Sequence, residues 1–309
     1  MDRRTFNKCI TASSVAVVLF KGGTNSLFAQ GALQNMSDDQ LKSDIKKAFT
    51  KYGCSRSSLY MFNQEFGYSN DTSERATDLF VGGLLREGYQ CGLLWGATLG
   101  VGAESLRRYT KTDQAIGVAV TATQNILQTF SNSVKDINCQ SITKCNLSGT
   151  GGMAKYLLSG RFIFCNKLAQ VWVPEAIKTA FQGTVIEKTG MPSPCISCAS
   201  EVAKKMGAND EEMVMVAGFA GGIGLSGHTC GALGAALWLN SIRYCKENPE
   251  KTGYANKKNK DIISAFRQAT MSEFKCNKIS GMSFKSIYEH TEFVKNGGCS
   301  TLINMLSMI

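Results

Sequence analysis

Helical periodicity runs through most of this chain, and only four prolines are available to interrupt it. Because proline removes a backbone donor and clashes with the preceding turn, its scarcity permits long helices. No stretch alternates apolar and polar residues in the manner of a half-buried strand. We therefore predict an all-α fold, a multi-helix bundle with glycine-rich helix packing around a cysteine cluster. The segments that carry the helical pattern are 41–52, 72–106, 112–130, 153–169, 174–182, 197–206, 261–273 and 283–295.

Two residues are predicted to begin helices, and one irregular stretch is predicted to lie between helical segments. Ser37 precedes an acidic turn and has the features of an N-cap, and Pro174 suits a first helical position. Between residues 132 and 152 the pattern dissolves into polar residues and glycines. We expect a loop or a domain junction there.

The charge of the chain is basic but dispersed. Lys and Arg number 34 against 24 Asp and Glu, which gives a formal net charge of +10. Apart from a short run at 257–260 the basic residues do not cluster, and no basic stripe is interleaved with aromatic residues. A nucleic-acid partner is therefore not expected.

The first 29 residues have the pattern of a twin-arginine-type signal peptide. Arg3 and Arg4 precede an apolar stretch over 9–20, and Ala29 ends a small-residue cleavage site. That pathway exports folded proteins, commonly with a cofactor already inserted, so we expect a periplasmic or exported protein. An ordinary secretory signal is the alternative. The apolar stretch is too short to span a bilayer stably.

The long segment 217–239, uncharged apart from His228, invites two other interpretations. Its G-x-G-x-x-G run at 222–227 would suit a dinucleotide only within a βαβ unit, which the helical pattern does not provide. Its seven glycines and polar centre fit a closely packed, buried pair of helices better than a membrane span. We expect no transmembrane span in the mature chain.

Twelve cysteines are the outstanding compositional feature. Removal of the leader with Cys9 leaves eleven, and an odd number argues against a scaffold in which every cysteine is paired. Cys195 and Cys198 have C-x-x-C spacing, but Ala199 stands where a covalent c-type haem requires histidine. No covalent c-type haem is therefore expected. A thioredoxin-like dithiol is a second interpretation of the pair, since a helix N-terminus lowers the pKa of a thiol.

Four cysteines lie beside glycine-rich sequence or predicted helix ends. They are Cys198, Cys230, Cys276 and Cys299. Thiolates that converge on one point suit an iron–sulfur cluster or zinc, and Gly231 and Gly234 would let the backbone close over such a group. Cys195 and Cys91 are reserve ligands. The alternative is that these cysteines are small buried hydrophobic residues.

Several of these motifs resemble one known family. They are Cys198-Ala199-Ser200-Glu201-Val202, Ala217-Gly218-Phe219-Ala220-Gly221-Gly222-Ile223-Gly224, Thr229-Cys230-Gly231-Ala232-Leu233-Gly234-Ala235-Ala236, Cys276 and Cys299. Over residues 195–304 this pattern is similar to that of the C-GCAxxG-C-C family, whose members are described as redox-active. A similar module forms part of the split-Soret cytochromes c, in which haem groups accompany an iron–sulfur centre.

The chain departs from the family pattern at two points. The family name reads Gly-Cys-Ala, whereas this chain reads Cys230-Gly231-Ala232. The stretch 87–92, with Cys91, also resembles the opening cysteine helix of the family, so either Cys91 or Cys198 is its first cysteine. A diverged duplication would explain why residues 82–106 and 198–239 share small residues and apolar helices. Shared helix-packing composition is the simpler explanation.

The resemblance implies a chain of three parts. These are the signal peptide at 1–29, an N-terminal helical region at 30–150 and a C-GCAxxG-C-C-like redox module at 151–309. We expect an exported redox protein with a cysteine-ligated iron–sulfur centre, which transfers electrons with a partner protein in the cell envelope.

Two other classes of function stay open. One is a thiol–disulfide oxidoreductase that uses Cys195 and Cys198, and the other is a non-catalytic secreted helical binding protein with structural disulfides. The chain has only two histidines and no recognised nucleophile motif, so the sequence does not support a hydrolase. A homodimer paired through Trp172 and Tyr244 is one option for the assembly.

Overall fold

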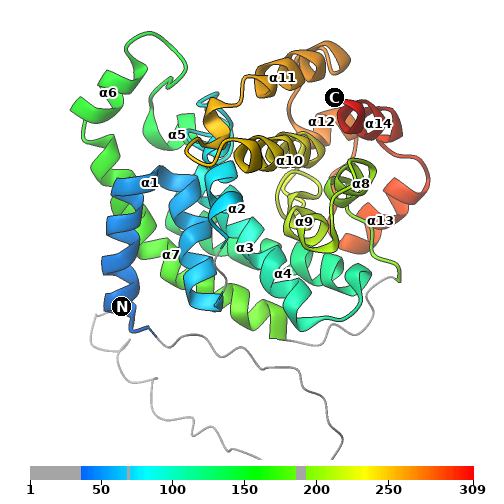
Figure 1. The fold of residues 1–309 in the computed structure, drawn as a ribbon, viewed down its shortest axis with the longest axis horizontal. Coiled ribbons are helices and arrows are strands. Elements are labelled where there is room, and N and C mark those ends of the chain that lie inside the picture. Colours follow the sequence, from blue (N-terminus) through cyan, green and yellow to red (C-terminus); the bar gives the residue numbers. More distant parts are fainter. Residues whose placement is uncertain (1–35, 68–69, 186–192) are drawn as a thin grey trace, which may run out of the picture. The chain divides into compact units, whose positions relative to one another are not determined.

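The computed structural model describes residues 36–67, 70–185 and 193–309 (Figure 1). Over these residues the chain forms fourteen α-helices and no strand, which confirms the predicted all-α class. The signal peptide expected at 1–29 lies outside the described residues.

The first half of the chain contains seven α-helices and one 3-10 helix. The predicted N-cap is confirmed, because the Ser37 side chain accepts a hydrogen bond from the Gln40 amide at the start of α1. Gly53, with φ 77° and ψ −173°, breaks α1 into two helical stretches. The elements are α1 (Asp38–Phe66), α2 (Asp71–Ala76), η2 (Thr77–Phe80), α3 (Gly92–Arg108), α4 (Thr112–Ser133), α5 (Cys139–Thr143), α6 (Gly152–Leu158) and α7 (Arg161–Val185).

The second half contains the other seven α-helices and two 3-10 helices. They are α8 (Cys198–Lys205), α9 (Asp210–Met215), η3 (Ala217–Phe219), α10 (Gly231–Glu247), η4 (Gly253–Ala255), α11 (Lys258–Ala269), α12 (Cys276–Ser280), α13 (Ile287–Lys295) and α14 (Ser300–Met308).

The two halves repeat one arrangement. Helix α2, η2 and α3 reappear 139 residues later as α9, η3 and α10, and α3 and α10 match at both ends. The N-caps match as well, because Asn70 and Asn209 each accept a hydrogen bond from a backbone amide three residues on. The structure therefore supports a diverged duplication. From the sequence alone, shared helix-packing composition was the simpler explanation. We call the halves, α1–α7 and α8–α14, the first and second repeats.

The loop that precedes α3 and α10 has the same unusual backbone in both repeats. In each loop most residues have positive φ, a conformation that costs energy for residues other than glycine. The Leu85 amide donates to the Leu79 carbonyl, as the Gly224 amide does to Gly218. The positive-φ residues are Gly82, Gly83, Leu84, Leu85, Arg86 and Gly88 in one loop and Gly221, Gly222, Ile223, Gly224, Leu225 and Gly227 in the other. We call these segments the glycine loops.

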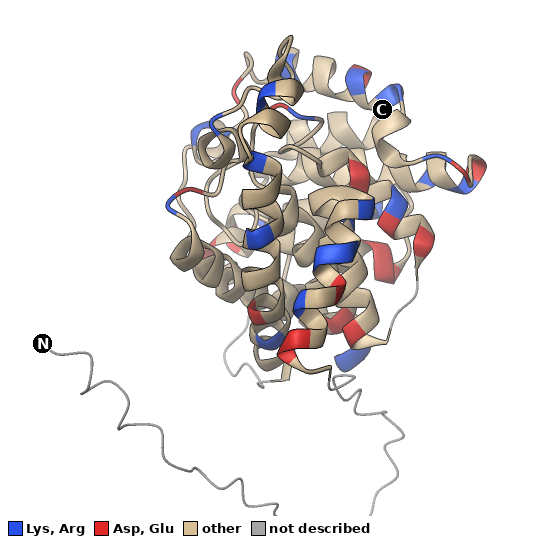
Figure 2. Cartoon of the chain, turned by 90° about the vertical axis from the view of Figure 1, so that its left-hand side faces the viewer, with Lys and Arg blue, Asp and Glu red and all other residues tan. Residues whose placement is uncertain are grey.

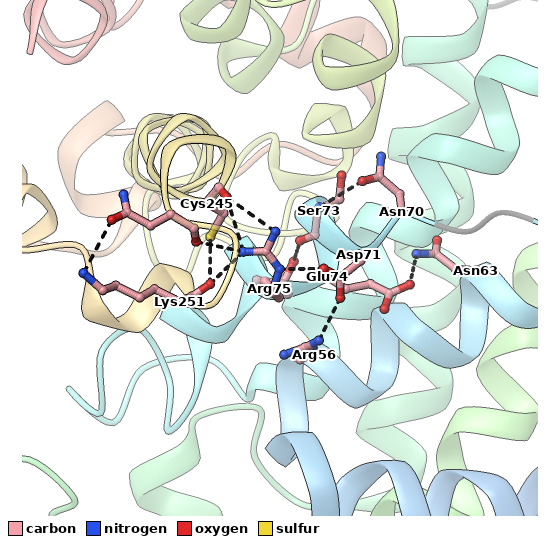
Figure 3. A network of polar contacts seen from close by, with 11 residues as sticks. Arg56, Asn63, Asn70, Asp71, Ser73, Glu74, Arg75, Cys245 and Lys251 are labelled. Carbon is pink, nitrogen blue, oxygen red and sulfur yellow. Dashed lines mark hydrogen bonds and ion pairs between the residues drawn. The ribbon is translucent and has the colours of Figure 1, made fainter.

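Each repeat contributes a short helix to the other. Helix α2 of the first repeat packs on α10 of the second, and α9 of the second repeat packs on α3 of the first. Arg75 of α2, which is buried, donates from its guanidinium to the carbonyl oxygens of Cys245, Asn248 and Lys251 (Figure 3). A cation at these carbonyls satisfies acceptors that the end of α10 leaves open.

Three aromatic rings and one glycine form the centre of the contact between repeats. Phe80 stacks on Trp95 at a centroid distance of 4.5 Å, and both rings meet Phe219 edge-on. A Cβ atom on Gly234 would lie 2.5 Å from the Trp95 ring. Gly234 occupies in α10 the position that Trp95 occupies in α3. Because Gly234 has no side chain, it leaves space in the second repeat for the Trp95 ring of the first repeat.

Two expectations from the sequence are corrected. Pro174 lies inside α7 rather than at a first helical position. The helix tolerates it because α7 packs on α1, α3 and α4, which offsets the one lost hydrogen bond. The stretch 132–152 is not only a loop, since it contains α5. The two repeats meet between α7 and α8.

One of the two residues through which a homodimer was expected to pair is not at the surface. Trp172 is fully buried and donates from its indole nitrogen to the Thr129 hydroxyl at 3.0 Å. It is therefore not available at a surface.

The described residues carry mixed surface charge. Acidic and basic side chains are interspersed along the helices (Figure 2), as the dispersed charge of the sequence predicts. Of the helices in the described part of the chain, none combines the length and the apolar composition that a membrane crossing requires.

Helix α13 holds the segment that leads into α8. The Thr291 hydroxyl accepts a hydrogen bond from the Ile196 amide at 3.0 Å, and His290 Nδ1 lies 3.1 Å from the Ile196 carbonyl oxygen. His290 is only 2% exposed, and burial lowers its pKa to about 4.

We predict that Gly234→Ala lowers the free energy of unfolding by about 1–2 kcal/mol. The clash with Trp95 outweighs the gain in helix propensity, which is at most about 1 kcal/mol. Urea unfolding measures the effect of Gly234→Ala in the unmodified chain, in Trp95→Leu and in Trp172→Leu. The cost should shrink in Trp95→Leu and persist in Trp172→Leu, which removes a buried tryptophan elsewhere. An equal cost in both would contradict this packing.

We predict that His290 makes the fold sensitive to acid. In the folded state its pKa is about 4, whereas in the unfolded chain it is about 6.5. The contribution of neutral His290 to the free energy of unfolding is therefore complete above pH 6.5. It is lost as the pH falls towards 4, and the loss is up to about 3 kcal/mol. Urea unfolding at pH 7 and pH 4 should show a smaller loss in His290→Gln than in the unmodified chain, both in the same metal state. An identical pH dependence would refute this role.

Candidate cysteine-ligated centres

The four cysteines singled out as ligands all occur at the starts of helices of the second repeat. Cys198 is the first residue of α8, and Cys276 is the first residue of α12. Cys230 and Cys299 are the N-cap residues of α10 and α14. We call these four residues the second cysteine set.

Backbone pairing holds two members of this set side by side. The Cys230 amide donates to the Phe274 carbonyl at 2.8 Å, and the Cys276 amide donates to the His228 carbonyl at 2.5 Å. These bonds flank an antiparallel bridge between Thr229 and Lys275. Packing of α8 on α10 and on α14 brings in the other two cysteines.

The pKa values show that the sulfurs of the second set share one environment. Burial, followed by repulsion from Cys198 and Cys299, raises the pKa of Cys230 to about 12. Burial, followed by repulsion from the other three thiols, raises the pKa of Cys276. Burial also raises the pKa of Cys198 to about 11, although the Gly221 amide donates to its sulfur. The structure therefore brings together all four predicted residues.

Cys91 does not belong to this group. It is the N-cap residue of α3 and corresponds to Cys230 in the repeat. Its electrostatic neighbours are three thiols that the sequence analysis did not select. Burial, followed by repulsion from Cys54, Cys139 and Cys165, raises the pKa of Cys91 well above its usual value. We call these four residues the first cysteine set.

The first set is built in the same way as the second. The Cys91 amide donates to the Ile137 carbonyl at 2.7 Å, and the Cys139 amide donates to the Tyr89 carbonyl at 2.6 Å. An antiparallel bridge between Gln90 and Asn138 lies between these bonds.

The other two members of the first set come from the two long helices. Cys54 begins the second stretch of α1, directly after the break at Gly53. Cys165 lies near the start of α7, and the Tyr156 hydroxyl donates to its sulfur. Burial is the main reason that the pKa of Cys165 is raised to about 11.

A signal for the first set was present in the sequence. The segment from Phe80 to Gly92 aligns without a gap on the segment from Phe219 to Gly231, and five glycines or cysteines coincide. Placing Cys91 on Cys230 then makes the cysteines on either side candidates for the remaining positions.

Cys195 belongs to neither set. Burial raises its pKa to about 11, and its charged neighbours are Asp113 and Lys295 rather than other thiols. A disulfide-exchanging pair needs a thiol whose pKa is lowered, whereas the pKa values of Cys195 and Cys198 are both raised. Cys195 lies in the irregular segment before α8, which α13 contacts at Ile196.

The two selected glycines have different surroundings. A Cβ atom on Gly231 would lie 1.8 Å from the Phe219 carbonyl oxygen, so only glycine lets the chain pass over α10 beside Cys230. Gly234, which was expected beside the cysteines, instead faces Trp95 of the first repeat.

In the described part of the chain the cysteine sets do not form the compact donor group of a single-ion site. A tetrahedral zinc site needs sulfurs about 3.8 Å apart, because each Zn–S bond is about 2.3 Å. Within the described ranges, no three Cys, His, Asp or Glu side chains are grouped closely enough to hold one metal ion. In an iron–sulfur cluster different iron atoms bind different thiolates, so the thiolates stand farther apart.

One buried side chain links the two sets. Gln90, which precedes Cys91, donates to the Gly222 carbonyl at 2.7 Å and accepts from the Thr229 amide at 3.0 Å. It is fully buried. Thr229 precedes Cys230, so a single amide side chain spans the distance between the two glycine loops.

Comparison with known proteins agrees with this arrangement. A family model described as "Putative redox-active protein (C_GCAxxG_C_C)" matches residues 52–175 and 193–309. The first segment contains the first cysteine set, and the second segment contains the second set. No curated protein and no solved structure shows significant similarity to the chain. On the extent of the family match, the chain belongs to the C-GCAxxG-C-C family of redox-active proteins.

Proposed function

We propose that this protein is an exported redox protein in which cysteines hold an iron–sulfur centre that serves electron transfer in the cell envelope. The observation that carries the proposal is the second cysteine set. Cys198, Cys230 and Cys276 are each less than a tenth exposed, and Cys198, Cys230 and Cys299 are all among the causes of the raised pKa of Cys276.

A bound cation would change the charge state of the set. Burial and mutual repulsion disfavour several thiolates in one place. The causes of the raised pKa values of Cys230 and Cys276 include no basic side chain. Iron ions supply the missing positive charge and bind the deprotonated sulfurs. An iron–sulfur centre at this place would supply one-electron redox chemistry.

The protein surroundings provide the means to adjust such a centre. The Gly221 amide donates to Cys198 Sγ, and the amides of Ala232 and Leu233 donate to Cys230 Sγ. Hydrogen bonds to ligand sulfurs and exclusion of water are the usual determinants of the reduction potential. The roles of these residues are therefore to bind, to donate hydrogen bonds and to exclude solvent.

Export and a redox partner complete the proposal. The paired Arg3 and Arg4 and the apolar stretch after them support transport by the twin-arginine pathway. That pathway suits a protein that must receive its iron–sulfur centre and fold in the cytoplasm. An electron carrier without a substrate needs a partner protein that gives or takes electrons.

We predict that the mature chain, purified without oxygen, is coloured and contains iron and acid-labile sulfide in matching amounts. Broad sulfur-to-iron charge-transfer bands in the visible spectrum should bleach on reduction. The measurement is an absorption spectrum together with iron and sulfide analysis. A colourless, iron-free protein from the same preparation would refute the proposal.

We predict that Cys230→Ser lowers the iron and sulfide content per chain, because it removes a ligand at the start of α10. Cys245→Ser is the matched control, since Cys245 is a buried cysteine of the same helix whose pKa is not affected by any other thiol. The control should keep the iron content of the unmodified chain. An equal loss in both variants would mean that the effect is one of folding rather than of ligation.

A further inference from the structure

We propose that the chain holds two iron–sulfur centres, and that the second of them is bound by Cys54, Cys91, Cys139 and Cys165 of the first repeat. This inference rests on the proposed function and assigns a further metal site.

The first argument is that the geometry which brings Cys230 and Cys276 together is reproduced at Cys91 and Cys139. Two backbone hydrogen bonds flank one antiparallel bridge in each repeat, and donor and acceptor correspond one to one. In both repeats the third cysteine begins a five-residue helix that ends at a residue with positive φ, Lys144 or Gly281.

The second argument is the position of the Cys54 sulfur. The Gly82 amide donates to Cys54 Sγ, as the Gly221 amide does to Cys198 Sγ. A Cβ atom on Gly92 would lie only 2.5 Å from Cys54 Sγ, so this sulfur lies against the start of α3. The glycine after Cys91 leaves the space that the Cys54 thiol occupies.

The third argument is that packing alone does not account for this set. A buried cysteine that acts only as a small hydrophobic residue has no reason to lie near other thiols, and Cys245 is such a residue. Tyr156 packs against the buried cluster that contains Cys139 and donates to Cys165 Sγ, so one side chain contacts both parts of the set.

A fifth thiol near this set is not part of the repeated pattern. Cys145 lies six residues after Cys139, and the corresponding residue of the second repeat is Met282. The Cys145 thiol donates to the Thr143 carbonyl at 3.3 Å. The four ligands are therefore those with a counterpart in the second set.

The two centres would lie on either side of the contact between the glycine loops. Gln90, the residue before Cys91, accepts a hydrogen bond from the amide of Thr229, the residue before Cys230. Tyr89 of the first loop stacks on Phe274, which precedes Cys276 by two residues, at a centroid distance of 4.6 Å. The first set would hold one centre and the second set the other, and the two centres would supply one-electron redox chemistry on both sides of the contact made by Gln90 and Tyr89.

The experiment compares iron and sulfide per chain in four anaerobically purified proteins and their unmodified parent. Cys139→Ser and Cys276→Ser should each keep about half of the iron and sulfide of the parent. The double variant should keep none, and Cys245→Ser should keep all. Iron and sulfide that are retained in Cys276→Ser and lost on the further change Cys139→Ser are held by the first set.

The outcomes separate this inference from the proposed function. If Cys276→Ser keeps no iron while Cys139→Ser keeps all of it, there is one centre only, and the inference fails while the proposed function stands. If the parent contains no iron, the proposed function itself fails.

A second measurement does not depend on whether any variant folds. A reductive titration of the unmodified protein, followed by the bleaching of its visible bands, counts the electrons that each chain accepts. About two electrons per chain agree with two one-electron centres, and about one electron per chain overturns the inference.

Discussion

Two pairs of backbone hydrogen bonds, one pair in each repeat, determine where the cysteines of this protein can stand. They join the end of a glycine loop to the segment before a short helix, and they leave Cys91 beside Cys139 and Cys230 beside Cys276. The left-handed path of the glycine loops is what turns the chain back towards this pairing. That path includes non-glycine residues at positive φ, whose cost must be offset by their surroundings. The loops meet across the contact between repeats through Gln90, which provides part of that offset.

The same arrangement keeps several thiols together in buried surroundings. The pKa values of the buried thiols are raised because water is excluded and because their neighbours are also thiols. Basic side chains satisfy other needs, as when Arg75 is bound to carbonyl groups at the end of α10. In the function that we propose, a bound metal cluster would carry positive charge into this site and would bind the thiols in their deprotonated form.

The fold class and four cysteines were predictable because their signals are local. Helical periodicity needs only neighbouring residues, and the glycines beside Cys230 and Cys299 are adjacent in sequence. Cys54 was missed because it lies beyond the predicted helix 41–52, where the pattern predicts no element, and only the structure shows a second helical stretch that begins directly after Gly53. Cys139 lies in a five-residue helix, too short for periodicity to reveal. The pairing of Cys91 with Cys139 depends on the path of a loop that composition does not determine.

The contact between Trp95 and Gly234 has a consequence for how such a molecule can be assembled. The two residues hold equivalent positions in the repeats, and the ring of one occupies the space left by the other. A dimer of identical chains would place like opposite like, with two indole rings competing for one space or two glycines leaving it empty. Fusion of both copies into one polypeptide removes that restriction. Each half is then free to acquire its own residues, so that complementary shapes replace exact symmetry.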